Sequence, residues 1–266
     1  MRFFKNLLIL LKHTLLRLLL LICFPALTIL FTLKSRYLLS IKNFIKSYIY
    51  LIKNPKYLFI NLNIFKLVVK SWKREKLDYG KGFLYQSFEN IGIFGLRATN
   101  EKINMIKKLI NINNLDILDI GSNSGFVSIE LSIEANNVDG VEPNKFILEH
   151  GNLLKEYYKL NNINFFNCKF EEFMVSKNYD IILSFANHST YDGETEFNLD
   201  EYFLKISELL SKKGKLIFES HHPYIEKDLT LVEDSIKKFF NINKVFIYES
   251  ENFIDNGRTW MLCERK

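Results

Sequence analysis

The stretch Leu118-Asp119-Ile120-Gly121-Ser122-Asn123-Ser124-Gly125-Phe126 decides the fold of this chain. The apolar run that leads into it, Leu115–Ile120, is typical of a buried strand, and a helix-like stretch, Phe126–Glu134, follows it. Two glycines between a buried strand and a helix let the backbone turn sharply and let a ligand approach it closely. The stretch therefore predicts a strand, a ligand-binding loop and a helix, in that order.

The same alternation of short apolar runs and helical stretches continues on the C-terminal side, which predicts a parallel sheet with helices on its faces. No helix fits between the last two runs, where Asp255-Asn256-Gly257 is typical of a turn, so these two strands are expected to be antiparallel. The expected strands are Leu115–Ile120, Asn137–Val141, Asn164–Asn167, Asp180–Ser184, Lys215–Glu219, Lys244–Tyr248 and Thr259–Cys263. The expected helices are Phe126–Glu134, Lys145–Lys159, Phe170–Val175, Leu199–Leu210 and Glu233–Phe240.

An acidic residue follows the second expected strand, which ends in Gly140-Val141-Glu142-Pro143. Glu142 lies 21 residues beyond Gly121. This is about where an acid on the second strand meets a ribose diol in nucleotide-binding sheets. A strand, a glycine loop, a helix and a strand that ends in an acid form a much stronger pattern than a glycine loop alone.

These residues resemble the first motif of the class I S-adenosylmethionine-dependent methyltransferases. That motif is typically Asp-x-Gly-x-Gly-x-Gly, and this chain has Asp119-Ile-Gly121-Ser-Asn123-Ser-Gly125, with Asn123 in place of the middle glycine. The resemblance covers about residues 82–266. It implies an α/β fold with a Rossmann-like seven-stranded sheet whose last strand is antiparallel. It also implies S-adenosylmethionine as the cofactor and methyl transfer as the activity.

The resemblance also implies which residues bind the cofactor. Glu142 matches the acid that binds the ribose hydroxyls, and Phe170 is expected to pack on the adenine face. Arg97 is expected to pair with the methionine carboxylate or an acidic substrate; the alternative is that it only lies beside a helix that begins at Asn100. The cofactor-binding residues predicted on this basis are Asp119, Gly121, Ser122, Asn123, Gly125, Glu142, Phe170, Ser184 and Arg97.

One position departs from the family pattern. Cys168 or Lys169 stands where the family often has an Asp that contacts the adenine amino group, and a lysine cannot accept that hydrogen bond. A backbone carbonyl near Phe170, or the carboxylate of Glu171, is expected to substitute.

Histidines gather at one predicted edge of the sheet, since His188 follows the fourth strand and His221-His222 follow the fifth. Methyl transfer to an alcohol needs a base, and a histidine can act as one near neutral pH. The predicted catalytic residues are His188 as the base, Asp192 to orient it or to bind a substrate hydroxyl, and His221. No regular ligand spacing supports a metal site.

Composition divides the chain into two parts. Residues 1–81 hold 16 Lys/Arg and two acidic residues, a net charge of +14, whereas the remainder holds 20 bases and 28 acids, a net charge of −8. The 48% hydrophobic content excludes global disorder, and three well-separated cysteines exclude a disulfide scaffold. We therefore expect a basic arm, residues 1–81, and a catalytic domain, residues 82–266.

The arm contains an uncharged stretch, Leu18–Leu33, which is sixteen residues long and is interrupted by Pro25. A spanning helix needs about 20 apolar residues, so spanning, re-entrant and interfacial placements all stay open. Lysines at helical spacing beside apolar residues continue to Lys73, a pattern that favours an anionic membrane surface. If the stretch spans, the positive charge that follows it, which is greater than the charge that precedes it, places the catalytic domain on the cytoplasmic side.

Together these features predict a methyltransferase at the cytoplasmic face of a membrane, peripheral or single-pass. The expected acceptor is a small or lipid-linked molecule, with a hydroxyl favoured and a cell-envelope glycan precursor as one candidate. The net negative charge of the catalytic domain opposes contact with phosphate groups, which disfavours a nucleic-acid partner. Two alternatives stay open: a tRNA base methyltransferase, motivated by the basic arm, and a non-catalytic cofactor-binding module located at the membrane.

Overall fold

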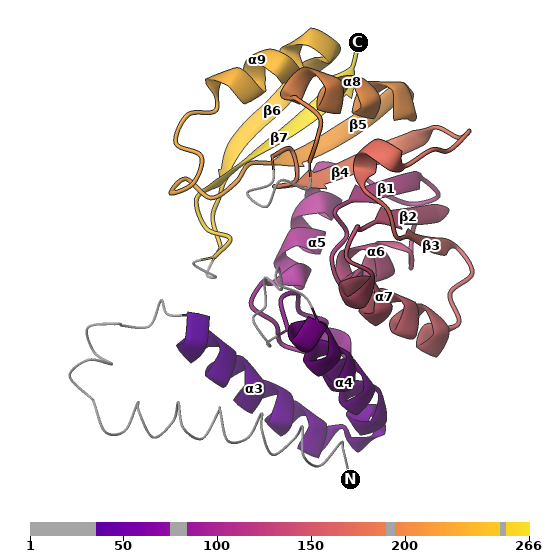
Figure 1. Cartoon of the computed structure of the whole chain (residues 1–266), viewed down its shortest axis with the longest axis vertical. Coiled ribbons are helices and arrows are strands. Elements are labelled where there is room, and N and C mark those ends of the chain that lie inside the picture. The colour runs from indigo at the N-terminus through magenta and orange to yellow at the C-terminus, as the bar shows by residue number, and fades with distance from the viewer. Residues whose placement is uncertain (1–35, 75–83, 190–194, 251–253) are drawn as a thin grey trace, which may run out of the picture. The chain divides into compact units, whose positions relative to one another are not determined.

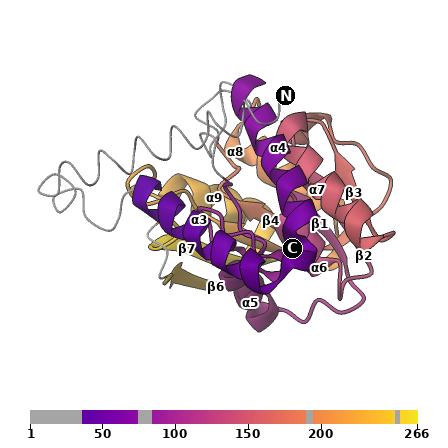
Figure 2. The same cartoon turned by 90° about the horizontal axis from the view of Figure 1, so that it is seen from below.

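The computed structural model describes residues 36–74, 84–189, 195–250 and 254–266. The chain divides into two compact units, which we call the N-terminal unit and the sheet unit. The N-terminal unit comprises Met1–Tyr85 and Glu89–Leu96, and the sheet unit comprises Gln86–Phe88 and Arg97–Lys266. The course of the described chain can be followed in Figures 1 and 2.

The sheet unit is built on one seven-stranded sheet with the order β3-β2-β1-β4-β5-β7-β6. Strands β1 to β5 pair in parallel, whereas β7 runs antiparallel to both β5 and β6. This confirms the predicted Rossmann-like sheet with an antiparallel last strand. The strands are β1 (Asp116–Ile120), β2 (Asn137–Val141), β3 (Ile163–Phe166), β4 (Tyr179–Phe185), β5 (Leu210–Glu219), β6 (Phe240–Tyr248) and β7 (Arg258–Arg265).

Helices cover both faces of this sheet. Successive side chains of a strand point to opposite faces, so Leu118 and Asp119 of β1 face different helices. Leu118 belongs to a core that includes Phe203 of α8, whereas the Asp119 carboxylate accepts a hydrogen bond from Ser128 of α6. The helices of the unit are α5 (Thr99–Leu109), α6 (Phe126–Leu131), α7 (Lys145–Tyr158), α8 (Leu199–Leu209) and α9 (Thr230–Phe239).

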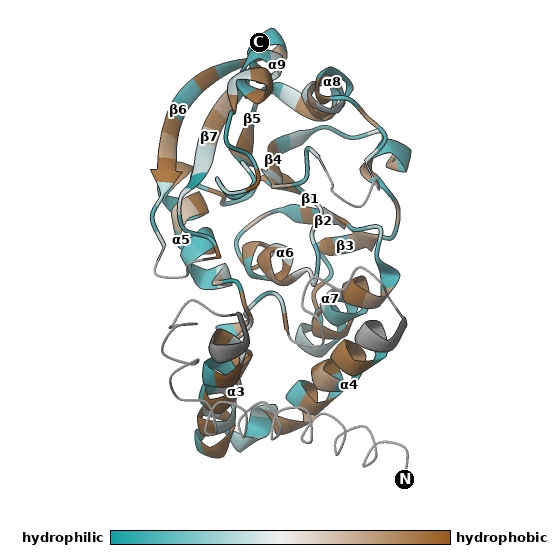
Figure 3. Cartoon of the chain, turned by 60° about the vertical axis from the view of Figure 1, so that its left-hand side comes forward, coloured by the Kyte–Doolittle hydropathy of each residue, from teal (hydrophilic) through white to brown (hydrophobic). Residues whose placement is uncertain are grey.

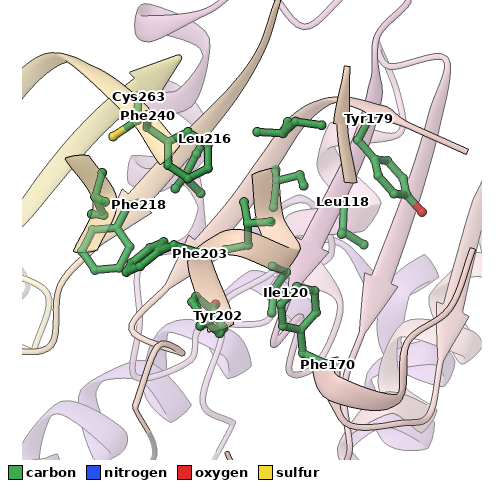
Figure 4. Packing of buried hydrophobic residues seen from close by; sticks show 14 of the residues in the cluster. Leu118, Ile120, Phe170, Tyr179, Tyr202, Phe203, Leu216, Phe218, Phe240 and Cys263 are labelled. Carbon is green, nitrogen blue, oxygen red and sulfur yellow. The ribbon is translucent and has the colours of Figure 1, made fainter. Parts of the chain in front are cut away.

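A hydrophobic core lies between the sheet and α8–α9 and is rich in aromatic side chains (Figure 4). Its members come from β1, β4 and β5 as well as from the helices, so it ties the strands that carry the predicted site to a rigid support. The Phe170 and Tyr202 rings meet edge-on within it, with centroids 5.3 Å apart.

The predicted elements differ from the observed ones mainly at their ends. The expected helix Phe170–Val175 is only a 3-10 turn, η3 (Phe170–Glu172). Strand β5 begins at Leu210, which pairs with Tyr179, although the glycine-containing segment before Lys215 is typical of a turn. The register shift between Tyr179 and Ile181 accommodates this extra length.

The N-terminal unit contains two helices, α3 (Arg36–Lys53) and α4 (Leu58–Arg74), joined at Asn54 by the 3-10 turn η1 (Pro55–Tyr57). Asn54-Pro55 is typical of a helix start, although the Asn54 side chain makes no cap hydrogen bond here. A 3-10 turn, η2 (Glu89–Ile91), lies in the segment that packs on these helices.

None of the helices in the described part of the chain combines the length and apolarity needed to cross a bilayer. The stretch Leu18–Leu33 lies outside the described residues.

Candidate functional site

The loop after β1 has the backbone conformation that the motif requires. Gly121, Asn123 and Gly125 all have positive φ, at 66°, 53° and 71°. Gly125 also has no room for a side chain, because a Cβ there would come within 2.6 Å of the Phe165 ring. Asn123 replaces a glycine without loss of the turn, because asparagine tolerates the left-handed region better than most residues.

The carboxylate of Glu142 is tied to this loop. It accepts hydrogen bonds from the backbone N–H of Asn123 at 3.0 Å and from the backbone N–H of Asn144 at 2.9 Å. Asn144 in turn caps α7, since its side-chain oxygen accepts hydrogen bonds from the N–H groups of Phe146 and Ile147. The structure thus places the acid that ends β2 beside the loop that ends β1.

Asp119 lies beneath the loop rather than on its surface. The residue is 3% exposed, and its carboxylate accepts a hydrogen bond from the Ser128 hydroxyl at 2.6 Å. Burial raises the pKa of Asp119 to about 6, although the Ser128 hydrogen bond and the charge of Lys102 lower it. Asp119 therefore holds the end of β1 against the start of α6.

Two amides from distant segments meet the loop. Gln86 accepts a hydrogen bond from the Phe126 N–H at 3.2 Å and donates one to the Ser122 carbonyl at 3.4 Å. Asn187, which follows β4, donates to the Ile120 carbonyl. Its amide also fills the space where a Gly121 Cβ would lie. The segment after β4 is therefore in direct contact with the loop.

The next residue, His188, forms a pair with a carboxylate that the sequence analysis did not identify. His188 Nε2 lies 2.8 Å from Oε1 of Glu226, and the other oxygen of Glu226 accepts the backbone N–H of His221 at 3.0 Å. His188 is only 1% exposed, and its Nδ1 has no hydrogen-bond partner among the described residues. The predicted partner Asp192 lies outside the described residues.

Electrostatics favour a charged Glu226 and a neutral His221. Burial works to raise the pKa of Glu226, but the hydrogen bond and charge of His188 outweigh it and leave that pKa below its usual range. Burial and the charge of His188 lower the pKa of His221, whose Nε2 lies 2.7 Å from the Ser189 carbonyl. The rings of His188 and His221 lie 4.8 Å apart, so the two predicted histidines are neighbours in the structure.

A second group of charges is buried at the end of β5. The Glu219 carboxylate is fully buried and receives hydrogen bonds from Arg97 at 2.8 Å, from Arg258 at 3.1 Å and from Lys102. Asp255 forms an ion pair with Arg97. We call these five residues the buried ion cluster. Arg97 therefore already binds two carboxylates, whereas the sequence analysis expected it to bind the carboxylate of the cofactor or of a substrate.

The pKa values in the buried ion cluster reflect its crowding. Burial and the charge of Arg97 lower the pKa of Lys102 to about 8, against the attraction of the two carboxylates. Burial works to raise the pKa of Glu219, but the three cations outweigh it and hold this pKa at about 2. Glu219 is therefore an anion at any pH at which the protein works.

Other predicted residues lie in the core or already have partners. The Ser184 hydroxyl is fully buried and shares a hydrogen bond with the Tyr202 hydroxyl at 2.8 Å. The Phe170 carbonyl, a predicted substitute for the adenine contact, accepts a hydrogen bond from Lys205 Nζ at 2.7 Å. The carboxylate of Glu171, the other substitute, accepts the backbone N–H of Glu196 at 2.8 Å.

Lys169 forms an ion pair with Glu196, with its Nζ 2.7 Å from Glu196 Oε1. The described residues contain no group of three or more His, Cys, Asp or Glu side chains arranged to hold a metal ion.

Comparison with known proteins identifies the family. A family model described as a methyltransferase domain matches residues 112–259, which is more than half of the chain. An RNA methyltransferase of Mycoplasma mobile is 38% identical over 80 residues, which are 28% of this chain and 22% of that protein. An rRNA adenine N-6-methyltransferase of Bacteroides fragilis is 36% identical over 90 residues, which are 31% of this chain and 33% of that protein. The matched segments thus span a third or less of these two relatives.

A solved structure shares the fold. The N-methyltransferase NodS from Bradyrhizobium japonicum, in complex with S-adenosyl-L-homocysteine, superposes with a TM-score of 0.55 at 9% sequence identity. The match covers 74% of this chain and 98% of that one.

Proposed function

We propose that this chain, a member of the methyltransferase domain family that uses S-adenosylmethionine as its cofactor, methylates a hydroxyl of a small or lipid-linked acceptor. The observation that carries the proposal is the buried pair of His188 and Glu226, in which His188 directly follows Asn187, the residue that contacts the loop after β1. An alcohol must lose its proton as it attacks, whereas an amine only needs to be neutral, so a base in this place suits an oxygen nucleophile.

The residues at the loop fit the cofactor. The left-handed backbone at Gly121, Asn123 and Gly125 turns the chain sharply after β1, and the two glycines add no side chain of their own there, as a closely approaching ligand requires. Each carboxylate oxygen of Glu142 accepts one backbone N–H at the loop, and a ribose hydroxyl is a donor that this carboxylate would also bind. When bound, the cofactor supplies an electrophilic methyl group.

In this proposal His188 takes the proton from the acceptor hydroxyl. Glu226, bonded to Nε2, holds the proton on that nitrogen and leaves Nδ1 to accept another. Glu226 also stabilises the imidazolium that forms, and it is itself fixed by the His221 N–H. Glu226 is thus a positioning residue in the place that the sequence analysis gave to Asp192, and His221 supports it through its backbone.

The cellular location is also part of the proposal. The +14 arm and its stretch Leu18–Leu33 would hold the enzyme at a membrane, with the sheet unit on the cytoplasmic face. A lipid-linked acceptor at that surface suits this placement. Fractionation of cells that express the full chain tests it, since most of the protein should sediment with membranes and a fully soluble protein would contradict it.

RNA is the second candidate acceptor. Two relatives that match the chain over about 30% of its length are described as methyltransferases of RNA or of rRNA adenine, and the basic arm would attract phosphate. The net charge of −8 on the catalytic domain opposes extended contact with phosphate around the site.

Incubation with methyl-labelled cofactor and fractionated cell material separates these acceptors. Label in a lipid or small-molecule fraction that resists mild nucleophiles, as an ether does, supports the proposal. Label in RNA establishes the second candidate, and label in protein contradicts both. No transfer to any fraction, with the cofactor bound, favours the non-catalytic module.

A further inference from the structure

Exposed apolar side chains are concentrated in the N-terminal unit. Eight of the eighteen large hydrophobic side chains that are exposed in the described chain lie between Phe44 and Leu62. Phe59 is 74% exposed and Ile52 is 64% exposed, so most of the surface of each residue is open to solvent. Monomeric soluble proteins rarely expose a contiguous patch of this kind without a partner for it. The eight are Phe44, Ile45, Tyr48, Ile49, Ile52, Leu58, Phe59 and Leu62.

On α3 these side chains form one continuous stripe. Phe44, Tyr48 and Ile52 are four residues apart, and Ile45 and Ile49 lie one residue further along the same rows. At 3.6 residues per turn, positions with this spacing share one helix face. Leu58, Phe59 and Leu62 repeat the spacing at the start of α4. We call these eight side chains the apolar face.

The opposite side of these helices is already occupied by the chain itself. Asn43 donates to the Gly95 carbonyl at 2.5 Å, and Asn61 donates to the Ile91 carbonyl at 2.7 Å. Ile60 and Ile64 of α4 are buried. The helices are therefore held in one orientation by the rest of their unit, and the apolar face is the side that those contacts leave outside.

Basic residues border the apolar face. Lys42, Lys46 and Lys53 fall on one edge of the α3 stripe, since they are four and seven residues apart. Residues 36–74 carry nine Lys/Arg and no acidic residue (the mixture of polar and apolar residues along α3 and α4 is coloured in Figure 3). A partner for this surface must offer apolar material and negative charge together.

Two other partners fit less well. RNA offers negative charge, but it binds exposed rings by stacking, and five of the eight side chains are aliphatic and have no flat face for a base. A second copy of the chain would bring an equally basic surface against the first, and the two would repel.

We propose that the apolar face lies in the interface of a membrane that contains anionic phospholipids, with the bordering lysines at the level of the headgroups. Amphipathic helices of this kind place their apolar side chains about 5–10 Å into the boundary between headgroups and acyl chains. The proposal deepens the membrane placement above, but it rests on α3 and α4 and does not need Leu18–Leu33.

Flotation of the full chain with vesicles tests this proposal. The vesicles are phosphatidylcholine, alone or mixed with phosphatidylglycerol. The variant I52E/F59E removes two large side chains from the apolar face and adds two negative charges. Its matched control, L231E/I247E, makes the same changes at positions of the sheet unit that are 75% and 66% exposed. All four positions are exposed, so both variants should fold, which their thermal unfolding verifies.

Binding to mixed vesicles should fall at least about tenfold in I52E/F59E and stay within about twofold of the wild type in the control. Salt should weaken the binding of the wild type, since exposed charges are screened. Equal flotation of both variants would overturn the proposal for this face and leave a membrane placement through Leu18–Leu33 intact. If the wild type did not float at all, both would fail.

Two further results would also overturn the lipid assignment. One is a loss in I52E/F59E of binding to added tRNA while vesicle binding is retained. The other is a wild-type dimer in sedimentation that I52E/F59E disperses while vesicle binding is retained.

Discussion

The buried ion cluster places charged side chains in the interior, whereas the apolar face places hydrophobic side chains at the surface. Both depart from the usual distribution of residues in a soluble domain. At the end of β5 the chain buries five charged groups, none of them more than 7% exposed. On α3 and α4 it exposes eight large hydrophobic side chains. The members of the first group bind one another, whereas the described residues of the N-terminal unit leave the second group exposed. Buried charges thus indicate ion-pair partners within the chain, whereas an exposed apolar face indicates a binding partner outside it.

The largest expected effect tests the buried ion cluster. Glu219→Gln removes the fully buried negative charge that binds three cations. Unpaired buried charges are costly, so the free energy of unfolding should fall by about 3–5 kcal/mol. Urea denaturation measures it. Glu233→Gln, which breaks an exposed ion pair with Lys237 on α9, is the control and should change little. A loss below about 1 kcal/mol in the Glu219 variant would show that the cluster is not what holds this end of the sheet.

The next effect concerns a buried base beneath the loop. Burial lowers the pKa of His150 to about 4 from its usual 6.5, so the folded protein binds a proton less readily than the unfolded chain. The stability that this group contributes is complete above about pH 6.5 and is lost as the pH falls towards 4, by about 3 kcal/mol in all.

The variant His150→Gln keeps a polar partner for Ser124, whose hydroxyl lies 3.2 Å from His150 Nδ1. Its unfolding free energy should depend less on pH between 6.5 and 4 than that of the wild type. Identical pH profiles for the two proteins would contradict the assignment.

A third effect compares two glycines with the same backbone strain. Gly125 has a φ of 71° and is crowded by Phe165, whereas Gly257 has a φ of 83° and no neighbour closer than 3.6 Å to a Cβ. Alanine at Gly257 should cost about 1–2 kcal/mol of stability because the backbone is left-handed, and alanine at Gly125 should cost more, because its Cβ would also meet the Phe165 ring. Only Gly125→Ala should also lower the affinity for S-adenosylmethionine, by about tenfold or more, as calorimetry can show. Equal affinities of the two variants for S-adenosylmethionine would show that this loop does not contribute to cofactor binding.

The smallest expected effect tests the exposure of the apolar face. Phe59→Ala on the apolar face should change the unfolding free energy by no more than about 0.5 kcal/mol in solution. Ile64→Ala, on the buried side of the same helix, should cost about 2–5 kcal/mol. Chemical denaturation of both variants makes the comparison. A large loss in Phe59→Ala would mean that the chain itself covers this face.

The sequence was sufficient for the sheet because its signals are local. The strand, glycine loop and helix around Gly121 follow directly from neighbouring residues, as does the antiparallel end of the sheet at Asp255-Asn256-Gly257. Asn123, which stands in place of the middle glycine of the motif, has the left-handed φ that the turn requires.

The partners within the site could not be read in the same way. Glu226 and His188 are 38 residues apart, and Arg97 and Glu219 are 122 apart, so only the folded sheet brings them together. Glu219 was visible as the end of the fifth strand, but its cations lie before β1 and after β6. Nothing in the local pattern distinguished Arg97 as a partner of Glu219 from Arg97 as a ligand of the cofactor.

The central claim is that His188, held by Glu226, is the base of the proposed reaction. The most direct measurement compares methyl transfer and cofactor affinity in His188→Gln, with the acceptor fraction that the wild type labels. We predict a loss of transfer of about a hundredfold or more, with the affinity for S-adenosylmethionine within about threefold of the wild type. Glu226→Gln should retain part of the activity and shift its pH dependence, because it only positions the histidine. Unchanged transfer in His188→Gln would contradict the claim.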